Sequence, residues 1–175
     1  MNAWLENTKG VNFHMKKLIT VLLTSMLLIT SKAYAAETLK EANTVYAKGD
    51  YALAVKLYTQ LALKGEVEAQ SWLAIMHDVG LGVPQDYAEA VKWYKLAAEQ
   101  GHGNSQAILG LKYSSGQGVP QDVVKGHMWL NLAAAQDVAH ARDVRTTEEK
   151  SMTPQQIAQA QKLASECLAR KYKGC

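Results

Sequence analysis

Apolar side chains recur at helical spacing over most of the chain. Between residues 86 and 101, apolar residues recur at steps of three and four, which places them on one helix face. They are Tyr87, Ala90, Val91, Tyr94, Ala97 and Ala98. Asp86 stands at the start of this run and Gly101 at its end, as is typical of helix termini. A second helix is predicted up to Ser115, before a Gly-x-Gly interruption. No window alternates apolar and polar residues over the length of a strand, so the pattern predicts an all-α fold.

The helical pattern repeats with a period of 36 residues. Gly82-Val83-Pro84-Gln85-Asp86 recurs as Gly118-Val119-Pro120-Gln121-Asp122. The same offset relates Gln70 to Gln106, Leu73 to Leu109, Tyr58 to Tyr94 and Trp93 to Trp129. Because a single helix pair cannot bury its apolar face alone, successive copies must stack on one another.

These repeated residues resemble a known family. The matching positions are Ala69-Gln70, Leu73, Gly80, Gly82 to Tyr87, Ala90 to Tyr94, and Ala97 to Gly101, which are similar to a Sel-one-like repeat (SLR), the 36-residue relative of the tetratricopeptide repeat. The resemblance implies αα-hairpins stacked as a right-handed superhelical solenoid of about eight helices. Its units are expected at about 50–85, 86–121 and 122–153. A capping helix over 154–171 is predicted to follow, its start marked by Thr153, Pro154 and Gln156.

The N-terminal segment has the three parts of a secretory signal. Lys16 and Lys17 precede a mainly apolar run over 18–29, and Ala33-Tyr34-Ala35 follows it. This run is shorter than the roughly 20 residues of a membrane-spanning helix. We therefore predict a cleavable signal peptide over 15–35, cleavage after Ala35, and a periplasmic or secreted protein; an uncleaved anchor is the alternative. Residues 1–14 fit none of these parts, which indicates that translation starts at Met15, and 36–175 is predicted to be one domain.

Net charge excludes some classes of partner. The chain has 19 Lys and Arg against 16 Asp and Glu, and the first 35 residues hold four of the basic and one of the acidic side chains. Residues 36–175 therefore carry 15 of each. This balance offers no basis for a nucleic-acid partner or for attraction to an anionic membrane. We expect no stable membrane insertion after signal cleavage.

The chain has two cysteines, Cys167 and Cys175. Export would permit a disulfide between them, and the alternatives are an intermolecular bond or two free thiols. Their spacing is not the C-x-x-C of a redox centre.

The remaining polar motifs point away from catalysis. His77, His102, His127 and His140 lie at unrelated positions without metal-ligand spacing. Some cysteine-rich SLR relatives are described as β-lactam-binding or β-lactam-hydrolysing, and a Ser followed three residues later by Lys is a motif of such enzymes. No Ser of this chain is followed three residues later by Lys. The repeated tryptophans are interpreted as core residues. The prediction is a protein that is not an enzyme, with no cofactor and no metal; a cell-wall-active or β-lactam-type hydrolase is the alternative.

The candidate partner site is a stripe on the first helix of each pair. If Leu73 and His77 face the core, steps of three, four and three residues trace the opposite face of the helix. These columns change chemistry from copy to copy, whereas packing residues recur. A concave groove is therefore predicted to bind a protein or peptide through Glu68, Ser71, Ile75, Asp78, Asn104, Ala107, Leu111, Ser114, His140 and Asp143.

Overall fold

The computed structural model describes residues 17–18 and 38–175. The predicted cleavage site, residues 1–14 and nearly all of the predicted signal peptide lie outside the described residues. The chain separates into two units, Met1–Lys40 and Glu41–Cys175, and the helical-repeat fold belongs to the second. Among the described residues, no helix is long and apolar enough to cross a membrane.

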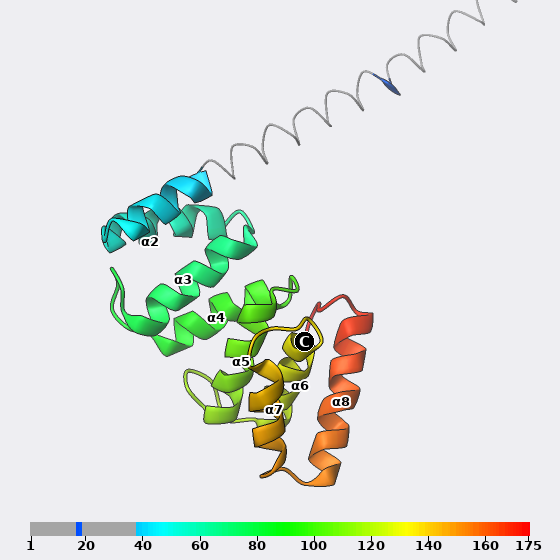
Figure 1. Ribbon diagram of the computed structural model, residues 1–175. Coiled ribbons are helices and arrows are strands. Elements are labelled where there is room, and N and C mark those ends of the chain that lie inside the picture. The colour runs from blue at the N-terminus through cyan, green and yellow to red at the C-terminus, as the bar shows by residue number, and fades with distance from the viewer. Residues whose placement is uncertain (1–16, 19–37) are drawn as a thin grey trace, which may run out of the picture. The chain divides into compact units, whose positions relative to one another are not determined.

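Helices alone build the described part of the repeat fold. A helical segment over 38–47 is followed by α2 (Tyr51–Ala62), α3 (Val67–Val79), α4 (Tyr87–Ala98), α5 (Gly103–Ser115), α6 (Val123–Ala134), α7 (Ala141–Glu149) and α8 (Pro154–Ala169). Figure 1 shows the helices of the second unit stacked pair upon pair along the chain. Residues 38–175 thus contain eight helical segments and no strand, which confirms the predicted all-α repeat solenoid.

An aspartate repeated every 36 residues caps helices, and in two of its three copies a glutamine precedes it. The aspartate side chain accepts a hydrogen bond from the backbone N–H three residues further on, at 2.9–3.1 Å, and this holds for Asp50, Asp86 and Asp122. Gln85 and Gln121 donate their side-chain amides to carbonyls in the last turn of the preceding helix, both at 2.8 Å. These bonds satisfy backbone groups that helix ends leave without intrahelical partners.

Two loop glycines allow close approach between neighbouring units. Gly82 and Gly118 have φ of 73° and 78°. A Cβ at Gly82 would lie 2.5 Å from the carbonyl of Tyr51, and one at Gly118 would lie 2.3 Å from the carbonyl oxygen of Tyr87. Tyr51 and Tyr87 begin α2 and α4, so each loop presses on the start of the second helix in the preceding pair. The Gly-x-Gly loops therefore serve packing.

Repeated side chains also fill the core. Tyr94, Leu109 and Trp129 are buried in its central cluster, and the partly buried Trp93 packs against it. The tryptophans are thus core residues, as predicted. A buried glutamine joins each unit to the one before it: Gln106 donates to the carbonyl of Ala98 at 3.1 Å. Gln70 makes the same contact one repeat earlier, with the carbonyl of Ala62 at 3.2 Å.

The last helix covers the end of the stack. Thr153 and Gln156 form the predicted capping box at its start, and α8 packs against α6. Its buried seam consists of Ala160, Ala164 and Cys167.

The chain then turns back on itself. Cys167 and Cys175 form a disulfide with their Cα atoms 5.7 Å apart. The sequence left open an intramolecular bond, an intermolecular bond or two free thiols, and the structure contains the intramolecular bond. Lys171 and Tyr172 adopt positive φ of 52° and 65°. Through this turn the Tyr172 ring reaches the backbone at Gly101, where an added Cβ would lie 3.1 Å from it.

Candidate functional site

The ten predicted groove residues differ in accessibility. The exposed members are Glu68, Asn104, Leu111, His140 and Asp143. The partly buried members are Ile75, Asp78, Ala107 and Ser114, while Ser71 is buried. The side chains that a partner could reach without rearrangement are therefore half of the predicted set.

Two of the less accessible residues join neighbouring units. The hydroxyl of Ser105 donates to that of Ser71 across 3.2 Å. The ammonium of Lys112 lies 2.5 Å from the carboxylate of Asp78. Both contacts connect α5 to α3, the first helices of successive pairs. Ser71 and Asp78 thus hold the repeats together along the face that was predicted to bind a partner.

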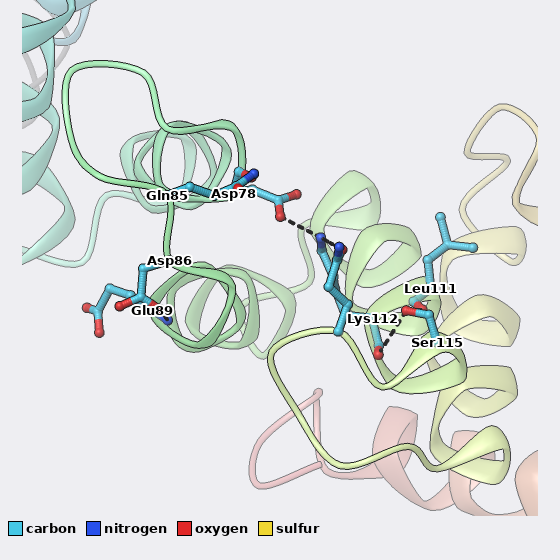
Figure 2. A network of polar contacts seen from close by, with 8 residues as sticks. Asp78, Gln85, Asp86, Glu89, Leu111, Lys112 and Ser115 are labelled. Carbon is cyan, nitrogen blue, oxygen red and sulfur yellow. Dashed lines mark hydrogen bonds and ion pairs between the residues drawn. The ribbon is translucent and has the colours of Figure 1, made fainter.

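Lys112 is the centre of a polar network (Figure 2). Besides Asp78, its ammonium contacts the side-chain carbonyl of Gln117 and lies 4.9 Å from the centroid of the Tyr87 ring. Its side chain is only 9% exposed, and a buried cation needs such partners because desolvation is costly. Burial raises the pKa of Tyr94 above its usual range, and the nearby Asp78 carboxylate has a smaller effect in the same direction. This network was not predicted from the sequence.

A second polar cluster holds α7 against α6. The fully buried His127 places Nε2 2.9 Å from Glu149 Oε1, and its Nδ1 lies 3.0 Å from the side-chain amide nitrogen of Asn131. Arg145 donates to the amide oxygen of Asn131 at 3.2 Å. Its Nε also lies 3.5 Å from Glu149, which closes a ring of four side chains. A histidine–carboxylate pair occurs in many hydrolases, but here one ring nitrogen contacts Glu149 on α7 and the other contacts Asn131 on α6 itself, so the pair serves packing between the two helices.

Glu148 adds a carboxyl group to the same region. Burial raises the pKa of Glu148, with smaller opposing effects from Ser114 and His127. One of its carboxyl oxygens, Oε2, is buried without a hydrogen bond. Ser114, predicted as a groove residue, therefore lies close to this partly desolvated acid on α7.

The last two predicted residues lie at the start of α7. His140 and Asp143 are more than four-fifths exposed, and His140 adopts a positive φ of 63°. Asp143 lines an open surface hollow together with Ala134, Asp137, Val138 and Arg142. Within the described ranges, 17–18 and 38–175, no group of three or more His, Cys, Asp or Glu residues could hold a metal ion.

Trp72 at the front of the stack is covered by other rings. Its ring centroid lies 4.9 Å from that of Tyr46 and 6.0 Å from that of Tyr58. The Tyr58 hydroxyl donates to the side chain of Asn43 at 2.7 Å, and burial together with Tyr46 raises the pKa of Tyr58 to about 12. These neighbours account for Trp72 as a packing residue of the first unit.

Two of the solved structures that resemble the chain are bacterial repeat proteins. One is a protective antigen present in uropathogenic Escherichia coli strains that displays an SLR fold; it is 28% identical, with a TM-score of 0.73, and the match covers 79% of this chain and 31% of the antigen. The other is a Sel1 repeat protein from Oxalobacter formigenes, 27% identical with a TM-score of 0.60, matched over 72% of this chain and 54% of its own. The chain thus spans less than two thirds of either protein. Among curated proteins, none matches.

The family model of the Sel1 repeat matches three consecutive stretches, residues 45–66, 67–102 and 103–138. The two complete matches begin at the starts of α3 and α5, whereas the units predicted from the sequence begin near the second helix of each pair. The period of 36 residues is the same in both divisions. Because the matched stretches cover more than half of the chain, the protein belongs to the Sel1 repeat family.

Proposed function

We propose that the protein is an exported, non-catalytic scaffold that binds a protein or peptide partner on the concave face of its repeat stack. Membership of the Sel1 repeat family supports the scaffold class, because stacked helix pairs provide an extended surface for binding. The observation that carries the proposal is Leu111, which lies on the predicted stripe of α5 and is 44% exposed.

The accessible part of the stripe has the composition of a small peptide site. Leu111 and the partly buried Ile75 are one repeat apart and provide apolar contact. Glu68 and Asn104, also one repeat apart, are exposed near the starts of α3 and α5. An apolar centre with polar side chains around it is the usual arrangement of a protein interface. A peptide following the stack would contact both pairs in turn.

The test compares two leucines of equal exposure. Leu111 lies on the predicted stripe, and Leu96 is also 44% exposed but lies on α4, the second helix of its pair. Immobilised protein would be used to capture partners from an envelope extract, followed by identification of the bound proteins. Leu111→Asp should remove the partners that the unmodified protein captures, while Leu96→Asp should keep them.

Circular dichroism is needed to show that both variants keep their helicity and melting temperature. Ile75 is left unchanged because it packs against the core cluster, where an Asp would disturb the fold as well as the surface. Equal capture by the unmodified protein and Leu111→Asp would place the site away from this stripe. Equal loss in both variants would show an effect of charge that is not specific to the stripe.

Export is the second part of the proposal. The Cys167–Cys175 disulfide supports it, because such bonds persist mainly in oxidising compartments. N-terminal sequencing of the protein recovered from expressing cells should begin at Ala36. A mature protein that keeps Met1 or Met15 would contradict the predicted cleavage.

A further inference from the structure

The charge of the repeat fold is balanced overall but unevenly distributed. Residues 150–175 hold five basic side chains and one acidic side chain, a net charge of +4. Residues 41–89 hold three basic and seven acidic side chains, a net charge of −4. The neutral total therefore conceals a cationic C-terminal segment.

Three of these cations lie in one covalently closed loop. Arg170, Lys171 and Lys173 are exposed and fall between the two cysteines of the disulfide. Figure 1 shows this loop running back from the end of α8. Tyr172, between the two lysines, packs against the core cluster and so does Cys175. The loop is thus anchored at partly buried positions while its cations remain at the surface.

The three loop cations also differ in their surroundings from the ion-paired cations of the fold. Lys92, Lys112 and Lys125 each have a carboxylate within 2.5–3.5 Å. No carboxylate from the described part of the chain forms an ion pair with Arg170, Lys171 or Lys173. Leu168, at the base of the loop, is 54% exposed. The surface therefore combines unpaired positive charge with an apolar side chain.

We propose that this loop docks the protein reversibly onto an anionic lipid membrane. An exposed ion pair with a discrete acidic peptide contributes little to binding, because solvent screens it and its geometry must be held. An anionic lipid surface attracts all the cations together and requires no fixed partner geometry, with about a fivefold gain in affinity for each Lys or Arg. Leu168 can enter the interfacial region alongside them. The net-negative residues 41–89 lie in the helices at the N-terminal end of the stack, whereas the loop follows α8 at the C-terminal end.

The experiment measures co-sedimentation with lipid vesicles. One set of vesicles contains equal parts of phosphatidylcholine and phosphatidylglycerol, and the other contains phosphatidylcholine alone. Arg170→Gln combined with Lys171→Gln and Lys173→Gln should lower the partition coefficient onto the anionic vesicles by on the order of 100-fold. The control combines Lys56→Gln, Lys92→Gln and Lys125→Gln, which gives the same net charge and should leave partition within a few-fold of the unmodified chain. Residues 1–40 are identical in every chain, so a difference in partition between two chains reports the substitutions.

Further measurements separate this proposal from simpler explanations. Circular dichroism and thiol titration must show that the triple loop variant is folded and keeps its disulfide, so that lost binding reports lost charge. Equal partition by the loop variant and the control variant would overturn the proposal. Capture of the unmodified chain by soluble poly-L-glutamate, with no preference for anionic over neutral vesicles, would also overturn it and would assign the loop to an acidic polypeptide.

Discussion

Lys112 reaches back 34 residues to Asp78 and connects the first helices of two successive repeats across 2.5 Å. The same separation relates Ser105 to Ser71, whose hydroxyl oxygens are 3.2 Å apart. The junctions between units thus use one geometry with different chemistry. A position that varies between copies can therefore serve contact between units as well as contact with a partner.

The first prediction concerns this ion pair. Lys112→Met would leave the Asp78 carboxylate, which is 18% exposed, without its cation. We expect a loss of about 3 kcal/mol in the free energy of unfolding, since removing one partner leaves an uncompensated charge. Combining Lys112→Met with Asp78→Leu should restore most of this loss, because Met76 occupies the equivalent position one repeat earlier and is buried. Urea denaturation of the three chains measures both effects, and a single variant as stable as the unmodified chain would contradict the role of the pair.

The fold was predictable because its determinants are local and repeated. Caps at Asp50, Asp86 and Asp122, together with the glycine loops, lie at fixed offsets in the sequence. The stripe was less predictable, since variation alone could not separate Leu111, which is exposed, from Ser71, which is buried.

The polar networks did leave a signal in the sequence. Lys112 stands one repeat after the buried Met76, and His127 stands one repeat after the buried Val91. A polar or charged residue in an otherwise apolar column must find partners or pay a desolvation penalty. Such an exception therefore predicts a buried network. Its partners, Asp78 and Glu149, could not be named from the sequence because the contacts depend on how the helices pack.

The second prediction separates backbone conformation from close packing. Gly118 and Gly65 both have positive φ, 78° and 89°, but an added Cβ would meet Tyr87 at 2.3 Å in the first case and nothing within 4 Å in the second. Gly65→Ala should cost about 1–2 kcal/mol, the usual penalty for a left-handed alanine. Gly118→Ala should cost more, because the loop must also move away from α4. Thermal unfolding of both variants tests this order, and equal costs would show that the loop yields freely.

The third prediction concerns the pH dependence of stability near Glu148. Burial raises its pKa in the folded chain, so the folded state binds the proton more tightly than the unfolded state. Its contribution to stability is present below the ordinary glutamate pKa and is lost as pH rises through the raised pKa. Glu148→Gln should therefore be more stable than the unmodified chain at pH 7, with the difference shrinking at acidic pH. Denaturant unfolding over a range of pH measures this, with the exposed Glu41→Gln as the control; a Glu148→Gln variant that is less stable at pH 7 would contradict the assignment.

The last prediction concerns the disulfide that closes the C-terminal loop. Cys167 and Cys175 are eight residues apart, and opening a loop of this length should cost roughly 2–3 kcal/mol through the greater entropy of the unfolded chain. Cys175→Ser should therefore lower the melting temperature, and a reductant should lower that of the unmodified chain to a similar value. The variant itself should not respond to the reductant, which serves as the control for effects unrelated to the disulfide. Because the loop also holds Tyr172 against Gly101, amide hydrogen exchange should increase at the end of α4 in the variant; unchanged exchange there would mean that Tyr172 stays in place without the bond.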